Sequence, residues 1–229
     1  MKNIRALDID MDFFLSGPCE LAAPGKRPPD GEAQPWSEDE VRAFLEHNCA
    51  LSKARPIPGA VFETHDMALD YWQARGAFPM HVTHIDAHSD LGIGRPGPAF
   101  VLESVITRAP GSRGNIAEYR ERKQLDEANY LLFAVAFRWI SSLDNVRNPN
   151  SRPDMPAFCR GNTLRLESSA GRILPALNHH EPEIAFNVYD DYRTFRADAP
   201  YDFATLAISP RYAPRTADFI IDIFHEYIT

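Results

Sequence analysis

Short apolar runs recur along the chain between segments rich in Gly, Pro and charged residues. Apolar runs of about four to eight residues that are bounded by turn residues favour buried β-strands. The strongest run, residues 130–140, predicts a central strand that enters a turn. The other predicted strands lie in the apolar first part of residues 4–14 and in residues 59–63, 80–85, 184–188 and 203–208.

Between these runs, apolar residues recur at helical spacing. Ser37 and Glu40 form a capping-box sequence, which marks the start of a helix. The predicted helices begin at Ser37, span residues 67–75 and 115–124, and follow Thr216 near the end of the chain. Strands that alternate with helices predict an α/β fold of three layers, in which helices cover both faces of a mostly parallel sheet.

Length and composition predict one globular domain over residues 1–229, since 44% of the residues are hydrophobic and 24% are charged. Two proline-rich stretches, residues 16–35 and 145–162, are expected to form long loops. The formal net charge of −8 argues against binding to nucleic acid or to an anionic membrane. The same charge suits a cationic substrate or metal ions.

Three cysteines, Cys19, Cys49 and Cys159, are too few for a disulfide framework and favour a reducing compartment. Asp8 falls where a signal peptide would need its apolar stretch. The sequence has no apolar run of the roughly 18 residues that a membrane span requires. We therefore expect a soluble cytoplasmic protein, whose oligomeric state the sequence leaves open.

Three acids at alternating positions follow the first apolar run: Asp8, Asp10 and Asp12. Side chains alternate along a strand, so these carboxylates would point to one side of an extended segment. Like charges held this close repel each other, and a bound cation would compensate for the repulsion. The alternatives are a strand end that frays into solvent and an acid that caps a helix.

A second set of acids and imidazoles at alternating positions begins at the end of the strand predicted over residues 80–85. It consists of His84, Asp86, His88 and Asp90. Carboxylates combined with imidazoles form ligand sets for divalent transition metals. A third and weaker signal is His65, which comes after another apolar run and at the start of a predicted helix. A single histidine in that setting more often caps a helix or makes a hydrogen bond.

All three segments place their acids and imidazoles after a predicted strand. In open parallel sheets ligands collect at the carboxyl ends of the strands, so these residues can converge. The expected metal ligands are Asp8, Asp10, His65, Asp86, His88 and Asp90. Six ligands exceed what one ion needs and indicate two ions about 3.5–4 Å apart that share carboxylates. The excess of carboxylates over imidazoles favours Mn²⁺ over Zn²⁺.

These residues resemble motifs of the ureohydrolase superfamily, which includes the arginases and agmatinases. Residues 84–90 are similar to its Asp-Ala-His-x-Asp motif, residues 7–10 to its Asp-x-Asp motif, and residues 65–69 to its His-containing helix start. The Asp-x-Asp pair comes last in typical arginases and first here, so the resemblance implies an arginase-like fold that is permuted. The start of the chain is most similar to the peptide arginases, which convert arginine side chains of ribosomally made peptides to ornithine and release urea.

The resemblance implies a role for each of these side chains around two Mn²⁺ ions. It assigns Asp8 and Asp86 as bridging ligands, His65 and Asp90 as the remaining ligands of one ion, and His88 and Asp10 as those of the other. Asp90 would also accept a proton during catalysis. Asp12 and His84 would orient the ligands, with His84 among the catalytic residues and Asp12 among the substrate contacts.

Two positions depart from the arginase pattern. Ala207 stands where arginases have a Glu that holds the guanidinium, and residues 114–117 lack the expected proton-shuttling His. The candidate replacements are Glu63, Glu181, Asp190 and Asp191 for the guanidinium contact, and His179 and His180 for the shuttle. His179, His180 and Glu181 precede Pro182 in a segment typical of a solvated loop, and an acid pair after a strand is typical of a cap.

The resemblance leads us to expect an arginine-containing peptide as substrate. A peptide needs an open cleft, and the length of the two proline-rich loops suggests that they form its rim. Three other functions remain open. The chain could be a ureohydrolase or amidohydrolase that acts on a free small molecule such as arginine or agmatine. It could be a deacetylase-like hydrolase, although the usual single-zinc site of those enzymes needs fewer acids. It could also be a non-catalytic module that binds a metal or a peptide.

Overall fold

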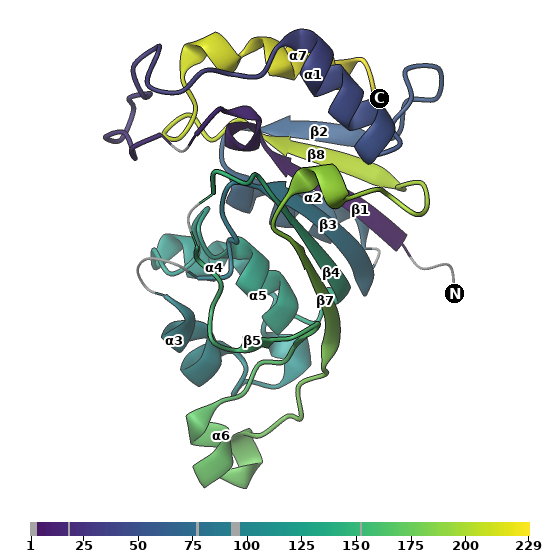
Figure 1. Ribbon diagram of the computed structural model, residues 1–229. Helices are drawn as coiled ribbons and strands as arrows, with labels where there is room; N and C mark the ends of the chain where they lie inside the picture. The colour runs from purple at the N-terminus through teal and green to yellow at the C-terminus, as the bar shows by residue number, and fades with distance from the viewer. Residues whose placement is uncertain (1–3, 18, 77, 93–96, 152) are drawn as a thin grey trace.

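The computed structural model describes residues 4–17, 19–76, 78–92, 97–151 and 153–229. At its centre is an eight-stranded sheet in the order β2-β8-β1-β3-β4-β7-β6-β5 (Figure 1). Every pairing from β2 to β7 in this order is parallel, and β6 and β5 add two antiparallel pairings at one edge. The strands are β1 (Ile4–Asp10), β2 (Gly59–Phe62), β3 (Met80–Asp86), β4 (Ile140–Arg147), β5 (Cys159–Arg160), β6 (Thr163–Leu164), β7 (Ile184–Tyr189) and β8 (Phe203–Ala207). The prediction of an α/β fold with a mostly parallel sheet is confirmed.

Helices pack on both faces of this sheet, with α1 and α7 together on one side and α4 and α5 on the other (Figure 1). The helices are α1 (Glu38–Ala43), α2 (Ala68–Arg75), α3 (Pro98–Phe100), α4 (Ile116–Glu121), α5 (Tyr130–Ala136), α6 (Ser169–Ile173) and α7 (Phe219–His225). Neighbouring residues of β1 enter different hydrophobic cores, because side chains alternate along a strand. Ala6 packs with residues of α2, α4 and α5, whereas Leu7 packs with residues of α1 and α7.

The prediction of a central strand over residues 130–140 is wrong. Tyr130–Ala136 is helix α5, and the chain then turns into strand β4 at Ile140. All seven residues of α5 are buried, so the segment has no polar face that would reveal a helical period. A short apolar run buried on all sides cannot be assigned to helix or strand from periodicity alone.

The ends of three other elements were also predicted, and one of these predictions is confirmed. The side chain of Ser37 accepts a hydrogen bond from the Glu40 N–H, and the Glu40 side chain accepts one from the Ser37 N–H, so the capping box at the start of α1 is confirmed. Thr216 does not cap the last helix, because it lies in the 3₁₀ turn Arg215–Ala217 and α7 begins at Phe219. Strand β4 continues to Arg147, which shortens the loop predicted from residue 145.

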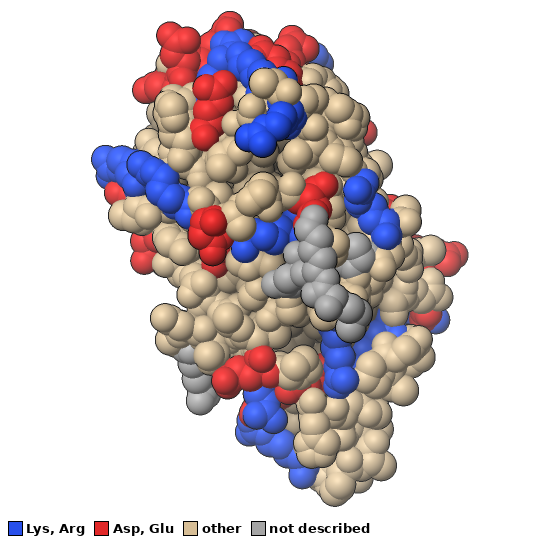
Figure 2. All heavy atoms as spheres, turned by 90° about the vertical axis from the view of Figure 1, so that its right-hand side faces the viewer, with Lys and Arg blue, Asp and Glu red and all other residues tan. Residues whose placement is uncertain are grey.

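The surface in Figure 2 shows Lys and Arg interspersed with Asp and Glu over the face that is turned toward the viewer. That face therefore presents no extended field of one sign. Within the described part of the chain, no helix combines the length and the apolar character that crossing a membrane requires.

Candidate metal centre

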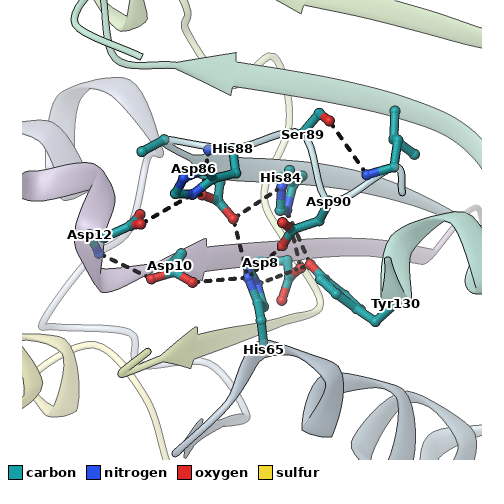
Figure 3. Close-up of polar contacts among 12 residues, drawn as sticks. Asp8, Asp10, Asp12, His65, His84, Asp86, His88, Ser89, Asp90 and Tyr130 are labelled. Carbon is teal, nitrogen blue, oxygen red and sulfur yellow. Dashed lines mark hydrogen bonds and ion pairs between the residues drawn. The ribbon is translucent and has the colours of Figure 1, made fainter. Parts of the chain in front are cut away.

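The candidate site lies where β1, β2 and β3 end. β1 and β3 are parallel neighbours, with Asp8 opposite His84, so the acids at their carboxyl ends come together. Asp10 is the last residue of β1 and Asp86 is the last of β3. The chain leaving β2 enters a 3₁₀ turn that begins with His65 and directs this side chain into the same space (Figure 3). Three segments that are far apart in the sequence thus meet at one edge of the sheet.

His65 is buried and faces three carboxylates with one ring nitrogen. Its Nδ1 lies 3.3 Å from Asp10 Oδ2, 3.3 Å from Asp86 Oδ2 and 3.1 Å from Asp90 Oδ2. Burial alone would lower the pKa of His65, but the carboxylates around it raise that pKa well above the usual value. We name His65, Asp10, Asp86 and Asp90 the His65 set. The three carboxylates strongly favour a positive charge at the position of His65 Nδ1.

A second group shares one residue with the first. His88 Nδ1 lies 3.2 Å from Asp12 Oδ2 and 3.4 Å from Asp86 Oδ1. Asp86 therefore turns one carboxylate oxygen toward His65 and the other toward His88. We name His88, Asp12 and Asp86 the His88 set. Its histidine is 39% exposed, so this side of the cluster is the more open one.

Asp8 is fully buried beneath these residues, and both of its oxygens have protein partners. Thr205 Oγ1 donates to Asp8 Oδ1 at 2.5 Å, and Tyr130 OH donates to Asp8 Oδ2 at 2.5 Å. Asp8 Oδ2 also lies 3.1 Å from His65 Nε2 and 3.5 Å from His84 Nδ1. Burial would raise the pKa of Asp8, but the two histidines hold it well below the usual value, so Asp8 is an ionised acceptor.

Several buried polar atoms of the cluster have no hydrogen-bond partner among the described residues. They are His65 Nδ1, Asp86 Oδ2, Asp12 Oδ1 and His84 Nε2. An unsatisfied buried polar group costs about 1–3 kcal/mol. The acids also oppose one another: burial, followed by the charges of Asp10 and Asp86, raises the pKa of Asp12 to about 7. A divalent cation would satisfy these atoms and cancel the repulsion, so the side chains fit a metal ion.

A cavity of about 210 Å³ lies beside the cluster. Its lining includes Asp10, His88, Asp90, Glu127, Ser209 and Tyr212. Asp90 and Ser209 both adopt a left-handed backbone conformation, with φ of 49° and 45°. Residues other than Gly hold such a conformation only where the surrounding structure enforces it, and functional sites are a common place for it. The Ser209 hydroxyl donates to Asp10 Oδ2, which ties the end of β8 to the cluster.

The cavity contains an acid that the sequence did not identify. Glu127 lines the cavity, and its nearest cationic partner among the described residues, Arg211 Nη1, is 3.8 Å away. Tyr130, which holds Asp8, was also missed. Tyr130 is the first residue of α5 and was hidden when residues 130–140 were interpreted as a strand. Glu127 lies three residues before α5, in a segment without a sequence signal for the site.

The structure does not bring Glu181 to the cluster, which corrects the expectation that it contacts substrate. Glu181 accepts hydrogen bonds from Arg113 Nη1 and Nη2 at 2.8 and 2.7 Å. It precedes β7 at the amino end of that strand, whereas the cluster lies at the carboxyl ends. His179 and His180 belong to the same segment; His179 Nε2 lies 3.1 Å from the Thr107 carbonyl oxygen, and His180 is exposed.

Of the remaining candidates, Glu63, Asp190 and Asp191 lie at the carboxyl edge of the sheet but outside the cluster, whereas His84 lies within it. Glu63 is exposed at the end of β2, two residues before His65. Asp191 accepts from the Arg193 N–H at the start of a 3₁₀ turn and pairs with the Arg193 guanidinium, so it is a cap. Asp190 lines a neighbouring cavity. His84 lies between Asp8 and Asp86, with its Nε2 3.4 Å from Asp86 Oδ2.

Imidazole nitrogens and carboxylate oxygens converge here without a thiolate, and the buried Asp and His groups can hold a metal ion. Such donors suit divalent cations of intermediate hardness. These donor atoms are the feature of the chain that bears most directly on its function. In comparisons with protein families, curated proteins and solved structures, no family model, no curated protein and no solved structure matches this chain.

Proposed function

We propose that this chain is a two-metal hydrolase of the ureohydrolase type, which cleaves the guanidinium of an arginine side chain to give ornithine and urea. The observation that carries the proposal is the position of Asp86, whose two oxygens face His65 at 3.3 Å and His88 at 3.4 Å. A carboxylate shared between two ligand groups is the arrangement found in sites that hold two metal ions about 3.5–4 Å apart.

The proposed ligands differ in three respects from those expected from the motifs: Asp8 is no longer a ligand, Asp12 becomes one, and Asp10 moves to the ion held by His65. The His65 set would hold one ion and the His88 set the other, so the Asp-x-Asp pair becomes Asp10 and Asp12. Asp8 would orient His65, because it faces Nε2 of the ring while the three acids of the His65 set face Nδ1. Carboxylates still outnumber imidazoles in this assignment, which supports Mn²⁺ over Zn²⁺.

Cations bound in this way supply a water nucleophile near neutral pH. The protein would supply the binding of the substrate and the transfer of its protons. Asp90 belongs both to the His65 set and to the cavity wall, where a carboxylate can accept a proton from water. Glu127 lines the same cavity, and its carboxylate would hold the cationic guanidinium, a role that buried Ala207 in β8 cannot fill.

The size of the cavity favours one side chain of a larger substrate. Its volume of about 210 Å³ is below the roughly 300–1,000 Å³ of pockets that enclose a whole drug-sized ligand. An arginine side chain entering from a peptide suits this space. A free small molecule such as arginine or agmatine is the second candidate, because the same acidic lining would also attract it.

The test is urea release by the Mn²⁺-supplied protein from arginine-containing peptides, from free arginine and from agmatine. Turnover of peptides alone supports a peptide arginase, and turnover of the free compounds supports a small-molecule ureohydrolase. Asp86→Ala is the matched control, since it removes the shared carboxylate and should abolish turnover. Release of acetate from an acetylated peptide would favour a deacetylase. Tight metal binding without any turnover would favour a non-catalytic module.

A further inference from the structure

A second cavity lies next to the first along the carboxyl edge of the sheet. It has a volume of about 350 Å³ and is formed by residues that follow β4 and β7, among them Arg147, Pro149, Met155 and Asp190. Asp154 lines this cavity and also the one beside the metal ligands. The two cavities, called here the two compartments, therefore share one lining side chain.

Asp154, the side chain that the two cavities share, is held by an ion pair and a hydrogen bond. Arg147 Nη1 lies 2.7 Å from Asp154 Oδ1, and both side chains are less than 10% exposed, at 6% and 9%. Asp154 Oδ2 accepts from the Ser89 N–H at 2.7 Å, and Arg147 Nη2 donates to the Ala87 carbonyl oxygen at 3.3 Å. The same ion pair thus braces residues 87–89, which carry His88 between Asp86 and Asp90. Asp154 and Arg147 therefore also hold in place the loop that carries the proposed metal ligands.

We propose that the second cavity is a subsite for a residue that flanks the target arginine in an extended peptide, and that Asp190 makes this subsite favour a positively charged residue. The inference depends on the proposed function for the identity of the target residue. Asp154 is neutralised by Arg147. Asp190 is exposed at the end of β7, and no ion pair to it is found within the described residues. Its charge is available to a ligand.

The spacing of the strands gives the position of the flanking residue. The first cavity lies at the ends of β1 and β3, and the second lies at the ends of β4 and β7, which are the next strands in the sheet. Strands in a sheet are about 4.8 Å apart, so the compartments are separated by roughly 10 Å. An extended peptide advances about 3.3 Å per residue. The flanking residue is therefore about two or three positions from the arginine.

The experiment measures the binding of fluorescent peptides by anisotropy, without turnover, to the Mn²⁺-supplied protein. Each peptide contains one ornithine, the product residue, and carries Lys, Gln or Glu two or three positions before or after it. We expect Lys to bind about two- to fivefold more tightly than Glu on one side of the ornithine, as for a single solvent-exposed ion pair. Asp190→Lys should reverse that order. Asp222→Lys, an equal change of charge on the exposed face of α7, should leave it intact.

Equal affinity for all peptides, or the same response to Asp190→Lys and Asp222→Lys, would overturn the subsite. The outcome is separate from the fate of the proposed function. Peptide affinities that depend on the flanking charge, without urea release from the matching arginine peptides, would retain the subsite and reject the arginase activity. Urea release at equal rates from all the arginine peptides would retain the activity and reject the subsite.

Discussion

His65 and Asp8 are joined on the side of the imidazole ring that faces away from the other carboxylates. His65 Nε2 lies 3.1 Å from Asp8 Oδ2, while His65 Nδ1 faces Asp10, Asp86 and Asp90. An ionised Asp8 accepts a hydrogen bond from Nε2–H and so fixes the tautomer in which the Nδ1 lone pair is free. In the proposed site, Asp8 would therefore act on the cation through His65.

Asp8→Asn should weaken Mn²⁺ binding without abolishing it. The loss of a group that orients a ligand typically costs about 10- to 100-fold in metal affinity. Asp86→Asn should be far more damaging, because the carboxylate that it alters faces both His65 and His88. Isothermal titration of the two variants with Mn²⁺ measures the difference. Equal losses of affinity would identify Asp8 as a direct ligand.

Asp12→Asn should reduce the number of bound Mn²⁺ ions from two to one. Asp12 is 3.2 Å from His88 and belongs to the His88 set alone, so the His65 set keeps its donors. Metal content after equilibrium dialysis gives the number of ions per chain. Glu63→Gln, at an exposed position on the same edge of the sheet, is the control that should retain both. Two ions retained by Asp12→Asn would exclude Asp12 as a ligand.

Tyr130→Phe should lower stability and also weaken Mn²⁺ binding, by less than Asp8→Asn does. The variant keeps the ring, whose centroid is 4.5 Å from that of His65, and removes only the hydroxyl that donates to Asp8. Loss of one donor to a buried carboxylate costs about 1–3 kcal/mol. Urea unfolding and Mn²⁺ titration check the two effects. Tyr119→Phe, a buried tyrosine in α4 whose hydroxyl accepts from Arg108, should leave Mn²⁺ affinity unchanged.

Glu181→Gln should destabilise the fold at neutral pH and leave Mn²⁺ binding intact. Arg113 is fully buried, and removing its carboxylate partner leaves an uncompensated charge, which costs about 3–5 kcal/mol. Burial would raise the pKa of Glu181, but Arg113 and Arg138 lower it below the usual value. A lowered folded-state pKa stabilises the fold above the unfolded-state pKa, near 4.3, and this contribution is lost as the pH falls through the folded-state value.

The difference in unfolding free energy between wild type and Glu181→Gln should therefore be full at pH 7 and should shrink below about pH 4. Urea unfolding at several pH values measures it. Unchanged stability combined with a loss of urea release would return Glu181 to the substrate site.

The alternating acids and imidazoles were sufficient to predict which segments meet. They were not sufficient to predict which acids gather around His65 and His88. Alternation places Asp8, Asp10 and Asp12 on one side only while the chain is extended, but β1 ends at Asp10 and Asp12 lies in the 3₁₀ turn Met11–Phe14. Asp10 accepts a hydrogen bond from the Asp12 N–H across this change of direction. The position of a strand end depends on its neighbours, which a single sequence does not reveal.

The second failure has a different cause. The run that forms α5 is apolar on every side because it packs inside the core, so its sequence carries no helical period. That error concealed Tyr130. Glu181 is the opposite case: it was a plausible contact by residue type, and the ion pair with Arg113, distant in sequence, gives it a structural role.

In the proposed site, two divalent cations share Asp86 between His65 and His88. Anomalous diffraction from crystals soaked in Mn²⁺ locates such ions. We expect two peaks about 3.5–4 Å apart on either side of the Asp86 carboxylate. A single peak, or none at these residues, would refute the shared carboxylate.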